Sequence, residues 1–414
     1  MKRVLTIMTA LILLTACASA PTAITTAVPT VTLAPTATFT LTQLPTATST
    51  ATLTATPYAT NTPRPTDTPR PPTLRGLADK LKFKIGSQII WENVVDPRVA
   101  SSYKEIASKD FNELVIDGEL IWGGTLVGTP KHIRPNQSTF NFEKADLLVD
   151  FAVKNGMSVQ AHHLVWGLYF SANRTVLPDW VLKGNFSRDE LVAIMQEHIR
   201  TVMEHYKGKV RAYTVVNEPF PYNQKVDFWF DRIGEVYIDI AFETARKADP
   251  NAILILNDAE NFSLDNRRAT YDYTTAQRLR NKTVEVNGKA YPLIDAVGIQ
   301  MYIDAARAPT KEQLKATMKK YGEAGVRVYV TEALVSVAKL TGSPEEKQKT
   351  QADIYADMLS ACLESGVCDG FAVFGLSDRT SKYVMGQDSF ASPMDENFNP
   401  KPAYFAIRNV LTGK

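Results

Sequence analysis

The feature that most constrains the fold of this chain is an alternation of short apolar runs with longer segments of helical spacing. The alternation fills the roughly 340 residues that follow Thr73, enough for a large buried core. Eight of the runs have the length and composition of β-strands. They are Lys84–Ile89, Glu113–Asp117, Ser158–His162, Tyr213–Asn217, Ile253–Asn257, Ala296–Gln300, Val326–Thr331 and Gly370–Phe374.

Eight strands joined by crossover helices predict an α/β fold, a closed (β/α)8 TIM barrel. A doubly wound open sheet is the competing architecture. That sheet would usually carry a glycine-rich phosphate loop after its first strand, and no such pattern follows Gly86.

Two helix boundaries are marked by capping signals. Ser187 and Glu190 have the spacing of a capping box and predict a helix start. Ser343 and Glu346 predict a second start, and Gly366 predicts the end of that helix.

The first residues of the chain are typical of an export signal. Lys2 and Arg3 precede a short apolar stretch, Val4–Leu14, that contains threonines. Since this stretch is too short to span a bilayer stably, we predict a signal peptide over residues 1–17.

The end of this segment, Leu14–Cys17, resembles the bacterial lipobox, in which the cysteine becomes the lipidated first residue. The alternative is ordinary secretion with cleavage after Ala18–Ala20, but Pro21 would then follow the cut and make a poor substrate. We therefore expect an exported lipoprotein anchored in a membrane through Cys17, at the bacterial cell surface or secreted.

A linker is predicted between the signal peptide and the folded domain. Residues 18–73 contain 20 threonines and 10 prolines and few large apolar side chains. Such a composition cannot offset the entropy of folding. We predict a disordered Thr/Pro-rich linker over residues 18–74 and a folded domain over residues 75–414.

Charge excludes one class of partner. Four basic and one acidic side chain give residues 1–73 a charge of +3, and the remaining 42 basic and 43 acidic residues give −1. A domain so close to neutral lacks the basic excess of a nucleic-acid-coating protein. We expect no nucleic-acid partner and a monomer.

Two carboxylates end predicted strands. Glu218 follows the fourth strand and Glu332 closes the seventh. Barrel enzymes place their sites at the carboxyl ends of strands, so these two side chains can face each other across the opening. Two carboxyls about 5–5.5 Å apart are what retaining glycoside hydrolysis requires. The alternative for each glutamate is a position on a surface loop.

Further motifs give this chain a family resemblance. They occur in the order and spacing typical of glycoside hydrolase family 10, the endo-β-1,4-xylanases, and run from about Leu77 to Val410. The motifs are His162–Trp166, Val216–Glu218, Asn257–Asp258, Gly298–Gln300 and Thr331–Glu332.

The resemblance implies a (β/α)8 barrel and a double-displacement mechanism without a cofactor. On the matching positions Glu218 is the proton donor and later the general base, and Glu332 is the nucleophile. Asn217 is expected to bind the sugar 2-OH. Other residues are expected to line the subsite of cleavage, namely His162, Trp166 and Gln300. The alternative for His162 is a hydrogen-bonded histidine in the barrel core. His163 is expected to point the other way on the strand and to contribute to packing.

The resemblance also implies a disulfide between Cys362 and Cys368. In an exported chain such a bond is chemically reasonable.

The chain departs from the family pattern around the second strand. The family's Glu-Asn-x-x-Lys-Trp signature aligns with Asp117–Trp122, so Gly118 and Ile121 replace an asparagine and a lysine. Asp117 and Trp122 stay candidates for substrate binding. Loss of two hydrogen-bonding side chains is expected to change substrate recognition.

Two other substitutions fall at the expected site. Tyr302 replaces a histidine and can donate a hydrogen bond to Glu332, and Phe374 replaces a tryptophan and keeps an apolar platform. No His-x-x-x-His pair occurs among the five histidines, so no metal site is expected.

We interpret the chain as a retaining endo-acting glycoside hydrolase that cleaves β-1,4-xylan or a related β-glycan. The alternative is a tethered carbohydrate-binding lipoprotein with little or no turnover.

Overall fold

The computed structural model describes residues 72–124, 133–171, 174–219 and 226–413. The predicted signal peptide, the lipidation candidate Cys17 and nearly all of the predicted linker lie outside these residues. Within the described part, none of the helices has the length and apolar character needed to cross a membrane.

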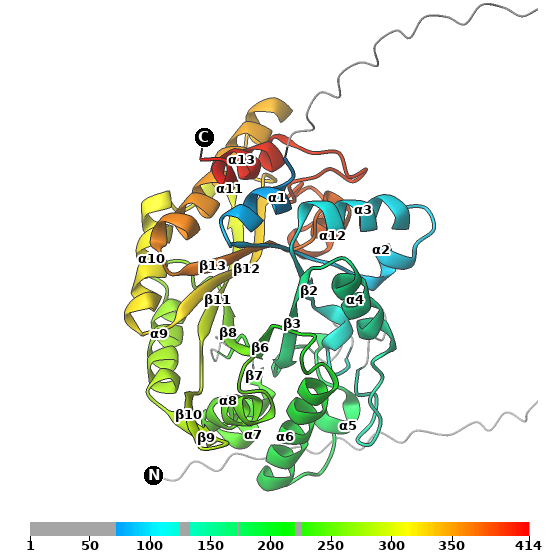
Figure 1. Ribbon diagram of the computed structural model, residues 1–414, viewed down its shortest axis with the longest axis vertical. Helices are drawn as coiled ribbons and strands as arrows, with labels where there is room; N and C mark the ends of the chain where they lie inside the picture. The colour runs from blue at the N-terminus through cyan, green and yellow to red at the C-terminus, as the bar shows by residue number, and fades with distance from the viewer. Residues whose placement is uncertain (1–71, 125–132, 172–173, 220–225, 414) are drawn as a thin grey trace, which may run out of the picture. The chain divides into compact units, whose positions relative to one another are not determined.

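The predicted barrel is confirmed. Eight strands close into a ring in the order β1-β13-β12-β11-β8-β6-β3-β2, and every neighbouring pair is parallel. Figure 1 shows this inner ring with the helices outside it. The bounds are β1 Lys84–Gln88, β2 Glu113–Ile116, β3 Ser158–Val165, β6 Ala212–Asn217, β8 Ile253–Ala259, β11 Ala296–Asp304, β12 Arg327–Ser336 and β13 Cys368–Val373. Closure excludes the open sheet.

The helices cover the outside of the barrel, and the two helix starts predicted from capping signals are confirmed. Ser187 and Ser343 each accept a hydrogen bond in a complete capping box, and Gly366 ends its helix in the left-handed conformation. The bounds are α1 Leu74–Lys80, α2 Trp91–Val95, α3 Ala100–Asp110, α4 Glu143–Lys154, α5 Asp179–Leu182, α6 Arg188–His205, α7 Phe228–Ile233, α8 Val236–Ala248, α9 Arg267–Arg280, α10 Lys311–Glu323, α11 Pro344–Ser365, α12 Asp378–Met385 and α13 Pro402–Leu411. Leu74, assigned to the linker from the sequence, is the buried first residue of α1.

Small elements lie on the loops between these segments. Two 3-10 helices are η1 Gly118–Leu120 and η2 Ala305–Arg307, and the short strands are β4 Leu168–Ser171, β5 Arg174–Thr175, β7 Val226–Asp227, β9 Thr283–Val286 and β10 Lys289–Pro292. Strands β4, β5 and β7 form one small sheet, and β9 and β10 form another.

The barrel interior is closed by packed side chains at the amino-terminal ends of the strands. A cluster of Ala212, Ile255, Ala296 and Tyr329 fills this end. Beside it, Arg211 donates to the Tyr329 hydroxyl at 3.1 Å and to the carboxylate of Glu113. The polar site is therefore left to the opposite, carboxyl-terminal end.

Four strands extend beyond their predicted ends. β3 continues past His162, β8 past Asn257, β11 past Gln300 and β12 past Thr331. β8 pairs with β11 as far as Ala259, and β11 and β12 pair with each other as far as Ser336. The candidate residues on these strands are therefore held within a sheet.

A disulfide joins α11 to β13. Cys362 and Cys368 are bonded, as predicted, and their Cα atoms lie 5.1 Å apart.

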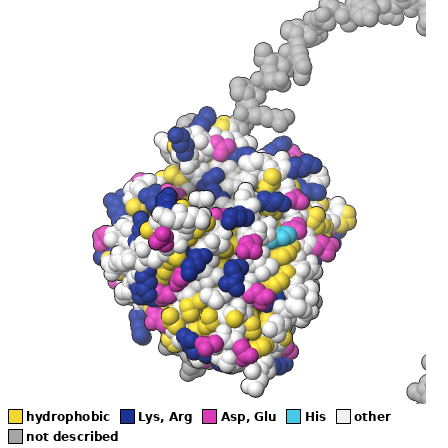
Figure 2. Space-filling view, turned by 60° about the horizontal axis from the view of Figure 1, so that its bottom comes forward, with side chains coloured by type: hydrophobic (Ala, Val, Ile, Leu, Met, Phe, Trp, Pro, Cys, Tyr) yellow, Lys and Arg dark blue, Asp and Glu magenta, His cyan; other side chains and the backbone are white. Residues whose placement is uncertain are grey.

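The surface of the domain has no separation of charge on the face shown in Figure 2, where basic and acidic side chains are intermixed. Their nearly equal numbers would lead one to expect this.

Candidate active site

Glu332 is buried at the mouth of the barrel and both of its carboxylate oxygens accept hydrogen bonds. It lies on β12 and is 3% exposed. Asn257 Nδ2 on β8 donates to Oε1 at 2.9 Å. The Tyr302 hydroxyl on β11 donates to Oε2, which is the hydrogen bond predicted from the sequence. Two donors of this kind favour the ionised carboxylate.

Glu218 lies directly after β6 and is held by its backbone and its side chain. Its amide N donates to the carbonyl of Asn257 at 2.7 Å, and its Oε1 accepts from Gln300 Nε2 at 3.1 Å. Its φ of +50° is in the left-handed region, which is unfavourable for a residue with a long side chain and persists only where the surrounding contacts hold it. The strand end therefore fixes the direction in which this carboxyl points.

A network of amides connects the two glutamates. Asn257 Nδ2 bonds both Glu332 and Asn217, where Oδ1 accepts at 2.8 Å. Gln300 Nε2 approaches the same Asn217 oxygen at 3.4 Å. Thr331 completes the network, since its hydroxyl lies 2.6 Å from Asn257 Oδ1. Four of the residues expected from the sequence are thus brought together around Asn257, namely Asn217, Glu218, Gln300 and Glu332.

Asn257 itself was not predicted as a site residue. It belongs to a motif at the carboxyl end of the fifth strand, where polar residues gather at a barrel mouth. That position was the signal available in the sequence.

The burial of Glu332 and its two hydrogen-bond donors act on its pKa in opposite directions. Burial raises its pKa to about 8, and the negative charges of Asp117 and Glu218 add to this rise. The hydrogen bonds from Tyr302 and Asn257 oppose it.

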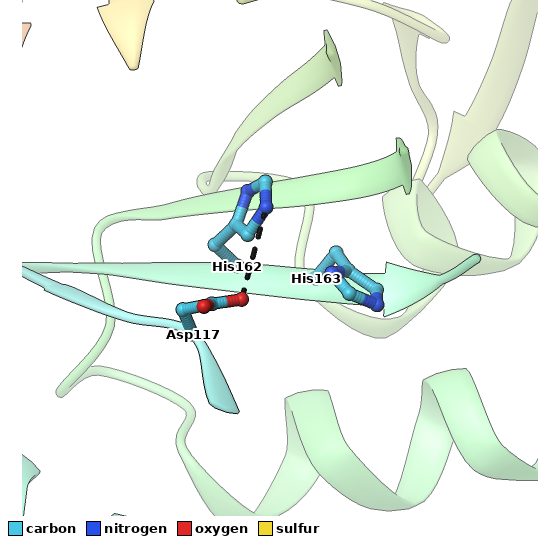
Figure 3. A group of neighbouring side chains, drawn as sticks. All are labelled: Asp117, His162 and His163. Atoms are coloured by element: carbon cyan, nitrogen blue, oxygen red, sulfur yellow. Dashed lines mark ion pairs between the residues drawn. The ribbon is translucent and has the colours of Figure 1, made fainter. Parts of the chain in front are cut away.

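His162 lies between two carboxylates. Its Nε2 is 3.5 Å from Glu332 Oε1 and 4.0 Å from Asp117 Oδ1, and Figure 3 shows Asp117 and His162 pointing toward each other. Its Nδ1 is hydrogen-bonded to Thr214 at 3.1 Å. Burial lowers the pKa of His162 to about 3, so the ring is neutral and serves as a hydrogen-bonding group.

His163 is packed in the core, as predicted, but its ring does not point away from that of His162. Its buried ring lies edge-to-face against that of His162, with centroids 5.1 Å apart, and against Trp166 at 4.9 Å. The peptide bond between the two histidines is cis. His163 is therefore part of the packing beneath this wall of the site.

Asp117, His162 and His163 have ligand atoms within 4.8 Å of one another, as a metal site would require. Two ligands about 2.0–2.1 Å from a tetrahedral zinc would lie about 3.4 Å apart. The 4.0 Å between His162 and Asp117 is wider. These side chains do not form a tight tetrahedral set, and we interpret them as part of the wall around Glu332.

Three aromatic candidates have different positions. Trp166 follows β3 and is 9% exposed. Phe374 follows β13, and its ring centroid is 5.8 Å from that of Tyr302, so it supports the hydroxyl that bonds Glu332. Phe374 therefore lies beside a partner of Glu332, whereas Trp166 packs against His163.

Trp122 is not brought to the mouth. Its ring is 1% exposed and stacks on His198 of α6 at 3.8 Å. Its indole N–H donates to the carbonyl of Leu164 at 2.6 Å. The side chain predicted to contact substrate is used in the core, because α6 packs over this part of the barrel.

The match to a known family agrees with this geometry. The family model for Glycosyl hydrolase family 10 matches residues 74–410. The chain belongs to this family.

Relatives within family 10 match over most of their length. Endo-1,4-beta-xylanase B of Thermotoga neapolitana is 33% identical over 348 residues, which cover 82% of this chain and 92% of that protein. The crystal structure of xylanase 10B from Thermotoga maritima has a TM-score of 0.71 and 31% identity, covering 82% of this chain and 98% of its own. Xylanase 10B from Thermotoga petrophila, solved with xylobiose, has a TM-score of 0.72 and 30% identity, covering 83% and 98%.

This family 10 chain differs from the family pattern next to Asp117. Gly118 is buried in η1, and Ile121, directly after η1, is 4% exposed. Neither can hydrogen-bond a sugar through its side chain. A third position, Gly167 after β3, has no room for a side chain, since a Cβ there would lie 2.3 Å from Asp227 Oδ1.

Proposed function

We propose that this chain is a retaining endo-1,4-β-xylanase, with Glu332 as nucleophile and Glu218 as proton donor. The observation that carries the proposal is the network around Asn257, which joins both glutamates at the carboxyl-terminal mouth of the barrel. The xylanase names of the matching relatives support the choice of substrate.

The proposed reaction has two displacements. In the first, the Glu332 carboxylate attacks the anomeric carbon while the Glu218 carboxyl protonates the departing sugar oxygen. This leaves a glycosyl ester on Glu332. In the second, the Glu218 carboxylate takes a proton from water, which attacks the same carbon and releases a product with its original configuration.

The neighbouring residues would hold the sugar and the transition state. Asn217 is within reach of both Asn257 and Gln300, and we propose that it binds the 2-OH. We propose that His162, Trp166 and Gln300 line the subsite of cleavage. Tyr302 would orient Glu332, while Asp117 and Phe374 would form the edges of the subsite.

The test of the nucleophile is covalent trapping. A 2-fluoro-xyloside that forms a stable ester should label Glu332, and peptide mass spectrometry should find the label on that residue. The Glu332→Ala protein should take up none. A label on another residue, or equal labelling of the variant, would contradict the assignment.

A panel of β-glycans tests the reaction itself. We expect the purified protein to release reducing ends from xylan, with a product of retained configuration by NMR. Measurable binding without turnover on any polymer would instead support a tethered carbohydrate-binding protein.

We further propose that the protein is exported as a monomer and held on a membrane through lipid on Cys17. The Lys2–Arg3 start and the lipobox-like Leu14–Cys17 support this. A Cys17→Ala protein is expected to lose incorporation of a labelled fatty acid. Equal incorporation into both proteins would contradict the anchor.

A further inference from the structure

Gln88 is a buried polar residue that the proposed mechanism does not use. It is the last residue of β1 and is 5% exposed. Strand register places it level with Val115 of β2, two residues along from the Gly86–Glu113 pair. Glu113 accepts a hydrogen bond from Arg211, which also donates to the hydroxyl of Tyr329 on β12, so this face of β1 and β2 is the interior one.

The orientation of the Gln88 amide follows from its partner. Its Nε2 donates to Asp117 Oδ2 at 2.9 Å. An ionised carboxylate accepts hydrogen bonds and donates none, so the NH2 group must face Asp117. The acceptor Oε1 then faces elsewhere, and it has no hydrogen-bond partner among the described residues.

A buried acceptor without a partner is unusual, because leaving such a group unpaired is costly. Gln88 contacts Asp117, Asp117 lies 4.0 Å from His162, and His162 lies 3.5 Å from the Glu332 carboxylate. The unpaired oxygen therefore belongs to a continuous row of polar groups that ends at the proposed nucleophile.

Two positions close to Asp117 in the described part of the chain offer no side-chain group that could recognise a sugar. Gly118 has no side chain, and Ile121 is apolar and buried. Hydroxyl groups are donors that suit the Oε1 of an amide and a carboxylate oxygen. A sugar bound beside Asp117 would therefore bring the donor that Gln88 lacks.

We propose that Gln88 Oε1 accepts a hydrogen bond from a hydroxyl of the bound xylan chain and is a specificity-determining residue. The proposal rests on the proposed xylanase function. The competing occupant is a buried water, because Gln160 Nε2 on β3, also level with Val115, lacks a partner among the described residues too. A water between the two amides would give Gln88 a purely structural role.

Binding measured without turnover separates these roles. Calorimetric titration of xylohexaose into Glu332→Ala protein gives the reference Kd. Adding Gln88→Ala, or Gln88→Met with a side chain of similar length, should raise Kd about tenfold, as loss of one buried hydrogen bond does. Gln160→Ala is the matched control and should leave Kd within about twofold.

Steady-state kinetics of proteins that keep Glu332 should agree with the titration. Gln88→Met is expected to raise KM on xylo-oligosaccharides with a smaller change in kcat, since the contact exists before the reaction. If the Gln88 variants keep the Kd and KM of their references but have a lowered Tm, the proposal is overturned, and a buried water between Gln88 and Gln160 is the better explanation. Normal sugar binding by the Glu332→Ala protein, with no turnover by the unmodified one, would contradict the proposed function alone. A protein that binds no xylohexaose would overturn both.

Discussion

Asn257 Nδ2 lies 2.9 Å from Glu332 Oε1, so an amide on β8 holds a carboxylate on β12. The two strands are not neighbours, since β11 lies between them. The bond therefore crosses the barrel mouth and fixes the carboxylate against the rest of the site. The same nitrogen also bonds Asn217, next to Glu218. Asn257 is thus a positioning residue for both glutamates.

Replacing Asn257 by alanine is expected to lower kcat about a hundredfold, since small displacements of reacting groups have effects of that size. Its hydrogen bond lowers the pKa of Glu332, so its loss should also move the acidic limb of the kcat/KM profile to higher pH. Thr331→Val, which removes the hydroxyl beside Asn257 Oδ1, should produce a smaller change in the same direction. A lower Tm with an unmoved pH profile would leave Asn257 only a structural role.

The Tyr302 hydroxyl provides the second donor to Glu332. Tyr302→Phe should reduce kcat about tenfold and raise the pKa of Glu332 further, because a donor to the charged form is lost. A pH-rate profile measures both effects. Tyr271→Phe removes a hydroxyl that bonds Glu235 at the surface and should leave the profile unchanged.

The sequence predicted these partners unevenly. The two glutamates could be found because a carboxylate that ends an apolar strand is a local pattern. Asn257 could not be ranked, because its role depends on side chains from β6 and β12. The length of β12 was missed for a similar reason, since Val335 and Val337 bond the backbone of Ser389–Ala391, far along the chain.

Trp122 shows the limit of an aligned motif. Its position in the signature suggested a sugar contact, but its ring stacks on His198. The arrangement of α6 over β3 decides this, and no local pattern near Trp122 contains it.

Glu332 should make the protein less stable as pH rises. The folded-state pKa of about 8 lies above the usual value of 4.5, so below pH 4.5 the group is protonated in both states and contributes no pH dependence. Between these values the unfolded state loses the proton first, and the free energy of unfolding falls by about 1.4 kcal/mol per pH unit. Glu332→Gln removes this titration.

Calorimetry at two pH values checks the sign. The Glu332→Gln protein should melt several degrees above the unmodified protein at pH 8 and close to it at pH 4. An equal difference at both values would show that packing, and not ionisation, is responsible.

Gly167 follows Trp166 at a point where no side chain fits. A Cβ would lie 2.3 Å from Asp227 Oδ1 and 2.7 Å from the Trp229 ring. Asp227 cannot easily move, because it accepts hydrogen bonds from the backbone of Trp229 and from the Tyr237 hydroxyl. Gly167→Ala should therefore lower the free energy of unfolding by about 1–3 kcal/mol.

The same substitution should also reduce kcat, since the displaced backbone carries Trp166 at the proposed subsite. Gly76→Ala in α1 is the matched control: its Cβ meets only Thr73 Oγ1, at an ordinary 3.4 Å, and alanine favours a helix by about 0.8–1.0 kcal/mol over glycine. Chemical denaturation should thus show opposite signs for the two variants. Equal stability of the Gly167→Ala and unmodified proteins would mean that Asp227 yields, and that this contact does not hold the end of β3.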